Sequence, residues 1–192
     1  NDSGTDNTVF GYTAGSSIDA GSNYNVYIGH QTAAGGTHDD AVMNTAVGYR
    51  SMYPLTSGDY NTALGADSLR SITSGGNNIA IGSSAGYAIT TASFNVAIGA
   101  NALKAEDTGG AGSIAIGYNS LTAQNGNGKN VAIGHQAAVR NTTGEKNVLI
   151  GYEAGLGAVS ANWTKNIAIG HQALYSLQTD ADNNVAIGDS AG

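Results

Sequence analysis

Short stretches that alternate large apolar residues with small ones recur along the whole chain. In Asn95-Val96-Ala97-Ile98-Gly99 the second and fourth positions are large and apolar, and the third is alanine. Such alternation predicts a short strand with Val and Ile on one face and Ala on the other. We expect Val96 and Ile98 to point into the protein and the alanines to form an exposed row.

The five-residue phrase occurs eleven times, which identifies the chain as a repeat array. Its final glycine recurs at steps of 17, 18 or 19 residues. A residue without a side chain at a fixed place after a strand indicates a turn with positive φ or a close backbone approach. The structural repeat glycines are Gly11, Gly29, Gly48, Gly65, Gly82, Gly99, Gly117, Gly134, Gly151, Gly170 and Gly188.

Asparagine opens ten of the eleven copies, and serine opens the other. When identical coils stack, each such side chain can bond its own turn and its counterparts above and below. We therefore expect a structural Asn ladder. Its members are Asn7, Asn25, Asn44, Asn61, Asn78, Asn95, Asn130, Asn147, Asn166 and Asn184.

The remainder of each repeat holds a second short segment, such as Arg70-Ser71-Ile72-Thr73, followed by a polar turn. Two short strands and two turns per repeat predict one coil of a parallel β-roll, or β-solenoid, in an all-β protein. Eleven coils spaced by about 4.8 Å would span roughly 50 Å. We expect one array over residues 1–192, and a segment of a longer fibre because both ends fall within repeats.

Each coil would bury few large side chains, and a continuous row of alanines allows another backbone to approach closely. Identical chains that associate side by side usually close with cyclic symmetry. The sequence therefore predicts a homo-oligomer. Periodicity leaves the number of chains open, and three is the number that we expect.

Composition and charge narrow the functional classes. The chain has a net charge of −7, and its seven basic residues are scattered along the sequence without a patch. We therefore expect no nucleic-acid partner, since such surfaces need clustered Lys and Arg. With no cysteine, the chain has neither disulfides nor thiolate metal ligands. It has no long apolar run, so we expect no membrane insertion by this segment.

The run from Asn44 to Gly65, with Asn-Thr-Ala-Val-Gly-Tyr and Thr-Ser-Gly-Asp-Tyr-Asn-Thr-Ala-Leu-Gly, resembles the repeats of phage-type tail fibre proteins. The Asn-Val-Ala-Ile-Gly phrases are also similar to the head repeats of YadA-type trimeric autotransporter adhesins. The resemblance covers the whole chain, and the repeat length favours the tail-fibre group. It implies a homotrimer of left-handed parallel β-rolls that forms a rigid fibre. Nothing in the chain resembles the self-trimming chaperone of such fibres, so the resemblance carries over no catalytic residue.

Several polar residues are candidates for binding a ligand. His30, His135 and His171 each follow a repeat glycine, and in a trimer each could form a ring of three imidazoles. Tyrosines share that position, which favours a half-exposed polar and aromatic slot. His38 lies in a turn beside Asp39 and Asp40, for which we expect a solvated loop. The acidic stretches 1–6 and 180–183 lack a full calcium ligand set, so we expect no metal and no cofactor.

Aromatic residues that depart from the repeat are candidates for receptor contact, because sugars stack on aromatic faces. Those singled out are Trp163, Tyr53 and Tyr175. A glycan-cleaving fibre would need paired carboxylates facing a groove. The glutamates Glu106, Glu145 and Glu153 are spread over different repeats, and no nucleophile or phosphate-binding motif is present. We expect no enzymatic activity.

These features together predict a structural shaft segment of a trimeric phage tail fibre that holds a receptor-binding tip for host attachment. The expected partners are two further copies of the chain, other virion or fibre proteins at its ends, and a host surface glycan. The expected location is the virion and therefore extracellular. The alternatives are a trimeric adhesin head on a bacterial cell surface that binds glycans or matrix, and a subunit of an extracellular filament.

Overall fold

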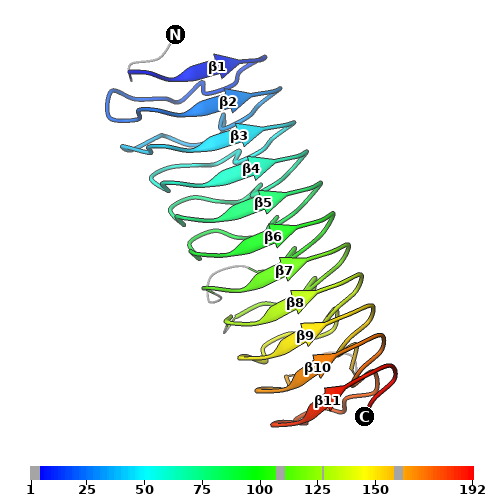
Figure 1. Cartoon of the computed structure of the whole chain (residues 1–192). Helices are drawn as coiled ribbons and strands as arrows, with labels where there is room; N and C mark the ends of the chain where they lie inside the picture. The colour runs from blue at the N-terminus through cyan, green and yellow to red at the C-terminus, as the bar shows by residue number, and fades with distance from the viewer. Residues whose placement is uncertain (1–4, 107–110, 127, 158–161) are drawn as a thin grey trace.

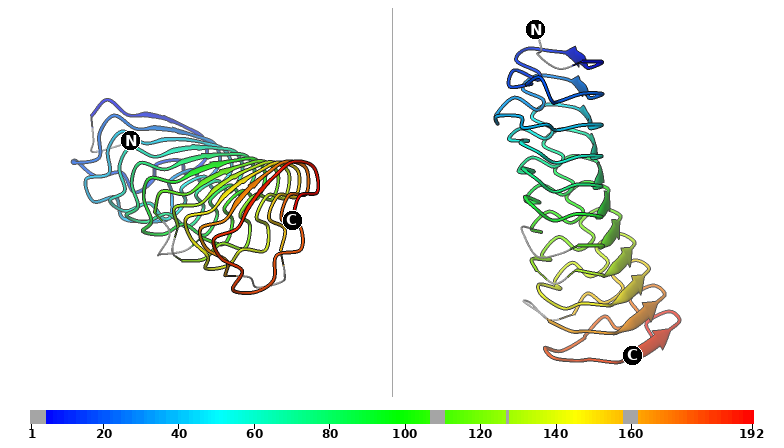
Figure 2. Two further views of the ribbon diagram at one scale, coloured as in Figure 1. Left: turned by 60° about the horizontal axis from the view of Figure 1, so that its bottom comes forward. Right: turned by 90° about the vertical axis from the view of Figure 1, so that its left-hand side faces the viewer.

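The computed structural model describes residues 5–106, 111–126, 128–157 and 162–192. These residues form an elongated roll in which the chain winds once per repeat and each coil lies beside the next (Figure 1). The two termini lie at opposite ends of the roll (Figure 2). The described residues contain strands and turns and no helix, as expected for an all-β solenoid.

Each coil contributes one three-residue strand, and the strands pair in parallel and in sequence order in a single sheet of eleven. The register places equivalent residues side by side, so that Ala97 pairs with Ala80 on one side and Ala115 on the other. The predicted parallel β-solenoid with steps of 17 to 19 residues is confirmed. The strands are β1 (Thr8–Phe10), β2 (Val26–Ile28), β3 (Thr45–Val47), β4 (Thr62–Leu64), β5 (Ile79–Ile81), β6 (Val96–Ile98), β7 (Ile114–Ile116), β8 (Val131–Ile133), β9 (Val148–Ile150), β10 (Ile167–Ile169) and β11 (Val185–Ile187).

The second segment of each repeat is a turn and not a strand, which corrects the expectation of two strands per coil. In the fourth coil Arg70 and Ser71 lie in a turn and Thr73 lies in a bend. The turn includes Asp67 and Leu69, whose φ values of 55° and 45° are in the left-handed region. Residues in that region bend the backbone away from the extended form that a strand requires. Hydrogen bonds between coils persist here, as from the Thr73 amide to the Thr90 carbonyl at 2.9 Å.

The strand faces are oriented opposite to the expectation. Ala97 is fully buried in the core, whereas Val96 and Ile98 are half-buried and lie on the outer side. The roll is narrow, and its interior is filled by large residues that follow the glycine, such as Leu103. Only a small side chain on the strand leaves room for them, so the alanines line the core and do not form an exposed row.

In two coils the strand contributes the large core residue and the position after the glycine contributes the small one, so the core volume is kept. Tyr27 takes the alanine position of β2, and Ala33 stands where five other coils have leucine or methionine. In β9 the alanine position holds Leu149, and Gly155 stands opposite. A Cβ on Gly155 would lie 2.8 Å from Cδ2 of Leu149. Because total volume is conserved within the coil, both exchanges keep the interior packed.

The repeat glycines are required by two constraints at once. Gly82 has φ of +126°, a value that residues with side chains rarely adopt. A Cβ at this position would also lie 2.7 Å from the carbonyl carbon of Gly99 in the next coil. The backbone of each coil therefore approaches the next coil directly at this turn.

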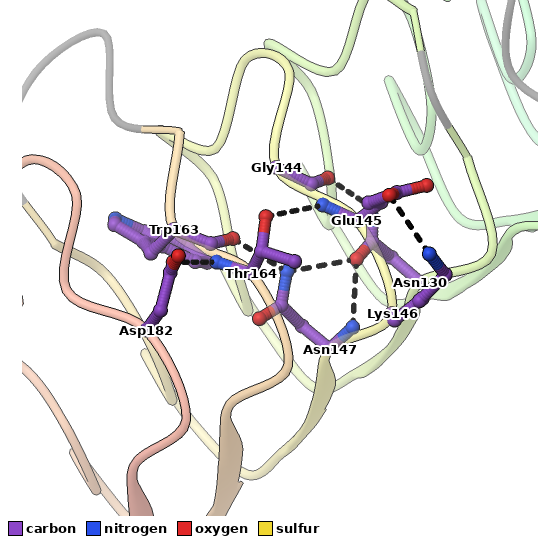
Figure 3. A network of polar contacts seen from close by, with 8 residues as sticks. All are labelled: Asn130, Gly144, Glu145, Lys146, Asn147, Trp163, Thr164 and Asp182. Atoms are coloured by element: carbon purple, nitrogen blue, oxygen red, sulfur yellow. Dashed lines mark hydrogen bonds and ion pairs between the residues drawn. The ribbon is translucent and has the colours of Figure 1, made fainter.

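The asparagine that opens each repeat joins neighbouring coils through its side chain (Figure 3). Oδ1 of Asn130 accepts bonds from the amide and from Nδ2 of Asn147, at 3.0 and 2.9 Å. Nδ2 of Asn147 also donates to the Trp163 carbonyl at 2.8 Å, and Oδ1 of Asn147 accepts from the Asn166 amide at 2.9 Å. Each buried asparagine thus ties its own turn to the coils on both sides.

The Asn ladder is interrupted at Ser113. The side chain of Gln124 takes over part of the role of the missing asparagine. The Asn130 amide reaches Oγ of Ser113 at 3.4 Å, which is a long bond. Nδ2 of Asn130 donates instead to Oε1 of Gln124 at 2.9 Å, and Nδ2 of Asn141 donates to the same oxygen at 3.1 Å. Gln124 is fully buried and supplies the acceptor that serine lacks.

The orientation of the strands predicts unequal effects of a charge at adjacent positions. Ala97→Asp should destabilise the chain by more than about 3 kcal/mol, because it leaves an unpaired charge in the core. Ile98→Asp should cost about 1 kcal/mol in single chains, because its side chain lies on the outer side. Thermal unfolding at a dilution where light scattering finds single chains measures both. Equal losses at the two positions would contradict the orientation.

The role of Gln124 can be tested by removing its side-chain oxygen and then restoring an asparagine at position 113 of the Asn ladder. Gln124→Leu should lower the free energy of unfolding by about 1–3 kcal/mol, because the side-chain amides of Asn130 and Asn141 each lose one of two acceptors and keep only the Gly144 carbonyl. Adding Ser113→Asn should restore part of this loss by completing the row. The measurement is urea unfolding of both variants, and an unaltered stability for Gln124→Leu would show that the contact contributes nothing.

Candidate interaction surface

The outer side of the sheet is a continuous apolar surface, which we call the aliphatic face. It consists of the first and last residue of each strand from β1 to β11. These are Val, Ile, Leu or Phe except for Thr8, Thr45 and Thr62. Ile79 is 41% exposed in the middle of the sheet, and Val185 is 67% exposed at its end. Apolar surfaces this extensive mark interaction sites on soluble proteins.

Two further rows border the aliphatic face. The pre-Asn row contains the residue directly before the first position of each repeat, and the post-Gly row contains the residue directly after each repeat glycine. The pre-Asn row is Asp6, Tyr24, Met43, Tyr60, Asn77, Phe94, Gly112, Lys129, Lys146, Lys165 and Asn183, all of them exposed. The post-Gly row is Tyr12, His30, Tyr49, Ala66, Ser83, Ala100, Tyr118, His135, Tyr152, His171 and Asp189, all exposed except for the half-buried Ala100.

The backbone holds the pre-Asn row in the left-handed region in every coil. Tyr60 and Phe94 have φ values of 58° and 63° and are 53% and 65% exposed. Residues with side chains lose about 1–2 kcal/mol in this conformation relative to the right-handed one. Asn77 and Gly112, at equivalent places, tolerate it more easily. Large apolar side chains are therefore presented to solvent at positions where the backbone disfavours them.

Aromatic rings stack along the post-Gly row in two groups. His30 lies between Tyr12 and Tyr49, with ring centroids 5.2 and 5.5 Å apart. The second group contains Tyr118, His135, Tyr152 and His171, with successive centroids 5.2 to 5.3 Å apart. The candidate metal ligands His30, His135 and His171 thus each pack against at least one tyrosine from a neighbouring coil. Across the described ranges, no group of three or more metal-ligating side chains occurs.

Between these two groups the post-Gly row contains only Ala66, Ser83 and Ala100. The row therefore has an aromatic group on each side of a stretch of small residues that covers three coils, and its last member is Asp189.

Three of the basic residues form a row, although the sequence suggested that they were scattered. Lys129, Lys146 and Lys165 occupy the pre-Asn position of three consecutive coils, and all are exposed. Glu145 lies among them, and its carboxylate accepts a bond from Nζ of Lys146 at 2.9 Å. That hydrogen bond lowers the pKa of Glu145, and the charges of the three lysines lower it further. Residues 17 to 19 apart in sequence become neighbours because the coils stack.

The turn that carries His38 is not the solvated loop that we expected. His38 is only 3% exposed and packs against the ring of Tyr27, with centroids 5.7 Å apart. Both ring nitrogens are buried without a hydrogen bond of ordinary geometry among the described residues. Asp39 and Asp40 remain exposed at the surface.

The candidates for receptor contact differ in exposure. Trp163 is fully buried, and a Cβ on Gly157 would lie 2.7 Å from its indole nitrogen, so it fills the core and offers no surface to a receptor. Tyr53 is half-buried beneath the guanidinium of Arg70, whose central carbon lies 4.4 Å from the ring centroid. Tyr175 keeps 41% of its surface exposed.

The acidic residues that are candidates for catalysis or calcium binding have separate environments in the described structure. Glu106 is buried in the interior, Glu145 pairs with a lysine, and Glu153 accepts a bond from Gln172 at 2.8 Å. Oδ1 of Asp182 accepts the Thr164 amide. Residues 1–4 of the N-terminal acidic stretch lie outside the described residues.

No protein-family model, curated protein or solved structure matches the chain. In the part of the chain that the structure describes, no helix has the length and apolar character needed to cross a membrane.

The buried His38 predicts a loss of stability in acid. Burial disfavours the imidazolium and lowers the pKa of His38 below its ordinary 6.5, although the Ala33 backbone and Asp19 act in the opposite direction. As the pH falls below 6.5, the unfolded chain therefore binds a proton that the folded chain resists. Stability should be full above this pH and fall by at most about 1.4 kcal/mol per pH unit below it.

Urea unfolding between pH 7.5 and pH 5 measures this loss as a slope. His38→Leu removes the titrating group while keeping an apolar side chain against Tyr27, so its slope should be shallower. An identical slope in the variant and the unaltered chain would assign the acid sensitivity to other groups.

Proposed function

We propose that the chain is a shaft segment of a homotrimeric phage-type tail fibre. In this proposal, stacked coils form a stiff rod that holds a receptor-binding tip away from the particle for host attachment. The observation that carries it is the aliphatic face, whose residues belong to all eleven strands. These strands follow one another along one side of an elongated roll (Figures 1 and 2). The resemblance of the repeats to tail-fibre repeats supports the same function and leads us to propose a left-handed coil.

The area of the aliphatic face supports association of whole chains. Eleven strands spaced by about 4.8 Å extend over roughly 50 Å. The face and its two bordering rows are at most about 20 Å wide, because the rows are six residues apart and a fully extended chain rises about 3.3 Å per residue. At most about 1,000 Å² per chain is then available to the two neighbours together, compared with the about 800 Å² that each partner buries in a stable interface of two chains. Covering this surface with identical chains would leave a rod with polar turns outside.

The proposed partners are two further copies of the chain, other virion or fibre proteins at its ends, and a host surface glycan. The proposed location is the virion. The chain would have no catalytic role, since its contribution is mechanical.

A second candidate is an adhesin head on a bacterial cell surface that binds glycans. The observation that favours it is the stack of exposed rings from Tyr118 to His171, because aromatic faces are suitable surfaces for sugars. Glycan binding that is lost on Tyr152→Ala while the assembly persists would support this alternative over a purely mechanical shaft.

The trimer predicts a particle mass of three times the 19.2 kDa of one chain, with an elongated shape. Size exclusion coupled to light scattering measures the mass. Ile116→Asp, in the centre of the aliphatic face, should dissociate the particle because a charge would be buried between chains. Thr91→Asp, at an exposed position outside the face, is the matched control and should leave the mass unchanged. A compact single chain for the unaltered protein would overturn the proposal.

A further inference from the structure

Aromatic and basic residues alternate at one position of four consecutive coils. The position is the fifth after each repeat glycine, and we call its residues in the third to sixth coils the outer row: Tyr53, Arg70, Tyr87 and Lys104. The coils hold these residues side by side. The Ser71 amide donates to the Tyr87 carbonyl at 3.1 Å, and the Ala88 amide donates to the Lys104 carbonyl at 3.0 Å. Residues that are 17 apart in sequence thus become neighbours along the roll.

The outer row does not belong to the aliphatic face or to the two rows that border it. In the fourth coil, the buried residues Ser68 and Leu69 stand between Ala66 of the post-Gly row and Arg70 of the outer row. The proposed assembly covers the aliphatic face and leaves the polar turns outside. The outer row therefore remains available to a further partner in single chains and in the assembly.

The two basic residues of the row differ in their surroundings. The guanidinium carbon of Arg70 lies 4.4 Å from the ring centroid of Tyr53, and this cation–π contact holds the charge on the row. Oδ1 of Asp67 lies 3.5 Å from Nε of Arg70 and offsets part of that charge. Lys104 is exposed on the far side of Tyr87, which is itself 37% exposed. Lys104 is therefore the stronger site for an anion.

Short side chains and hydroxyls follow the outer row in each coil. The next residue along the chain is compact and half-buried in all four coils, as in Pro54, Ser71, Ala88 and Ala105. The ninth residue after the glycine carries an exposed hydroxyl in the third to fifth coils, namely Ser57, Ser74 and Thr91. A ligand that lies along the outer row would meet rings and charges on one side and hydroxyls on the other.

We propose that the outer row binds a linear acidic polysaccharide that lies parallel to the axis of the roll. Tyr53 and Tyr87 contact its sugar rings, Arg70 and Lys104 pair with its acidic groups, and the exposed hydroxyls bond to its own hydroxyls. This inference rests on the proposed function only in taking a surface glycan as partner. It specifies that glycan as acidic and gives it a site.

The spacing of the row selects this class of ligand. Coils follow one another at about 4.8 Å, so the two tyrosines, and likewise the two basic residues, are roughly 10 Å apart. An extended chain of equatorially linked pyranoses advances by nearly one coil spacing per sugar. A polysaccharide with one acidic group on every second sugar therefore places its charges at Arg70 and Lys104 and its neutral sugars at the tyrosines.

A more densely charged polymer fits the surface less well. A nucleic-acid strand has a phosphate on every nucleotide and offers no alternation of charged and neutral units. The chain has a net charge of −7, which repels a dense polyanion outside the outer row. The alternation of rings with charges is thus the feature that the ligand must match.

The first test concerns the ring of Tyr87, with a hyaluronan decasaccharide as the probe because it has one carboxylate per disaccharide. Tyr87→Ala should raise the dissociation constant measured by calorimetry at least about threefold, because apolar area buried against a sugar is lost. Tyr87→Phe should keep the affinity. The matched control is Tyr175→Ala, at the same position of the tenth coil, where the preceding coil has Leu156 in place of a basic residue. Equal losses in Tyr87→Ala and Tyr175→Ala would overturn the site.

The second test concerns charge. Lys104→Gln should raise the dissociation constant about two- to fivefold, as expected for the loss of one exposed ion pair. Arg140→Gln changes the net charge equally at an exposed position of the eighth coil and should leave the affinity unchanged. A neutral cello-oligosaccharide and single-stranded DNA should both bind more weakly than the decasaccharide. Equal affinity for either of these polymers, or equal losses in the two variants, would overturn the acidic ligand.

Light scattering on the same samples separates this site from the proposed fibre. A multi-chain particle that does not bind the decasaccharide would overturn the outer-row site and leave the fibre standing. Single chains that bind it with the losses expected for Tyr87→Ala and Lys104→Gln would support the site while overturning the fibre.

Discussion

The close approach of one coil to the next is the constraint on which the rest of the structure depends. At Gly82 the backbone leaves no room for a side chain beneath Gly99. Four residues before each of these glycines, the Asn ladder joins the same two coils through the bond from the Asn95 amide to Oδ1 of Asn78. Together they set the position of every coil relative to its neighbours. Insertions are confined to the polar turns, so the steps vary between 17 and 19 residues without disturbing the sheet.

The narrow cross-section that results divides the side chains between interior and surface. In coils such as those of Leu69, Leu103 and Leu121, a large residue fills the interior opposite the strand, and the strand contributes an alanine. The exchange of sizes between Leu149 and Gly155 shows that volume, and not residue identity, is what the core requires. Large β-branched residues are consequently placed outside, where a single chain leaves them half-exposed. The same geometry that packs the roll therefore creates the surface through which we propose that it assembles.

The repeat, the parallel sheet and the glycine turns follow from the sequence because they depend on period and on backbone geometry. The direction in which Ile98 points did not, because alternation defines two faces without saying which is inside. The opposing wall, represented by Leu103, decides it. The row of Lys129, Lys146 and Lys165 was missed because the lysines are distant in sequence and become adjacent only when coils are stacked. Trp163 was expected at the surface because it departs from the repeat, but its side chain is buried in the core.

The most direct test of this division is the reactivity of single cysteines, since the natural chain has none. A thiol placed by Ala97→Cys should resist a water-soluble maleimide whether the chain is single or assembled. A thiol placed by Ile98→Cys should react readily in dilute single chains and become protected at concentrations where the particle forms. A reactive thiol at position 97 beside a protected one at position 98 in single chains would contradict the account.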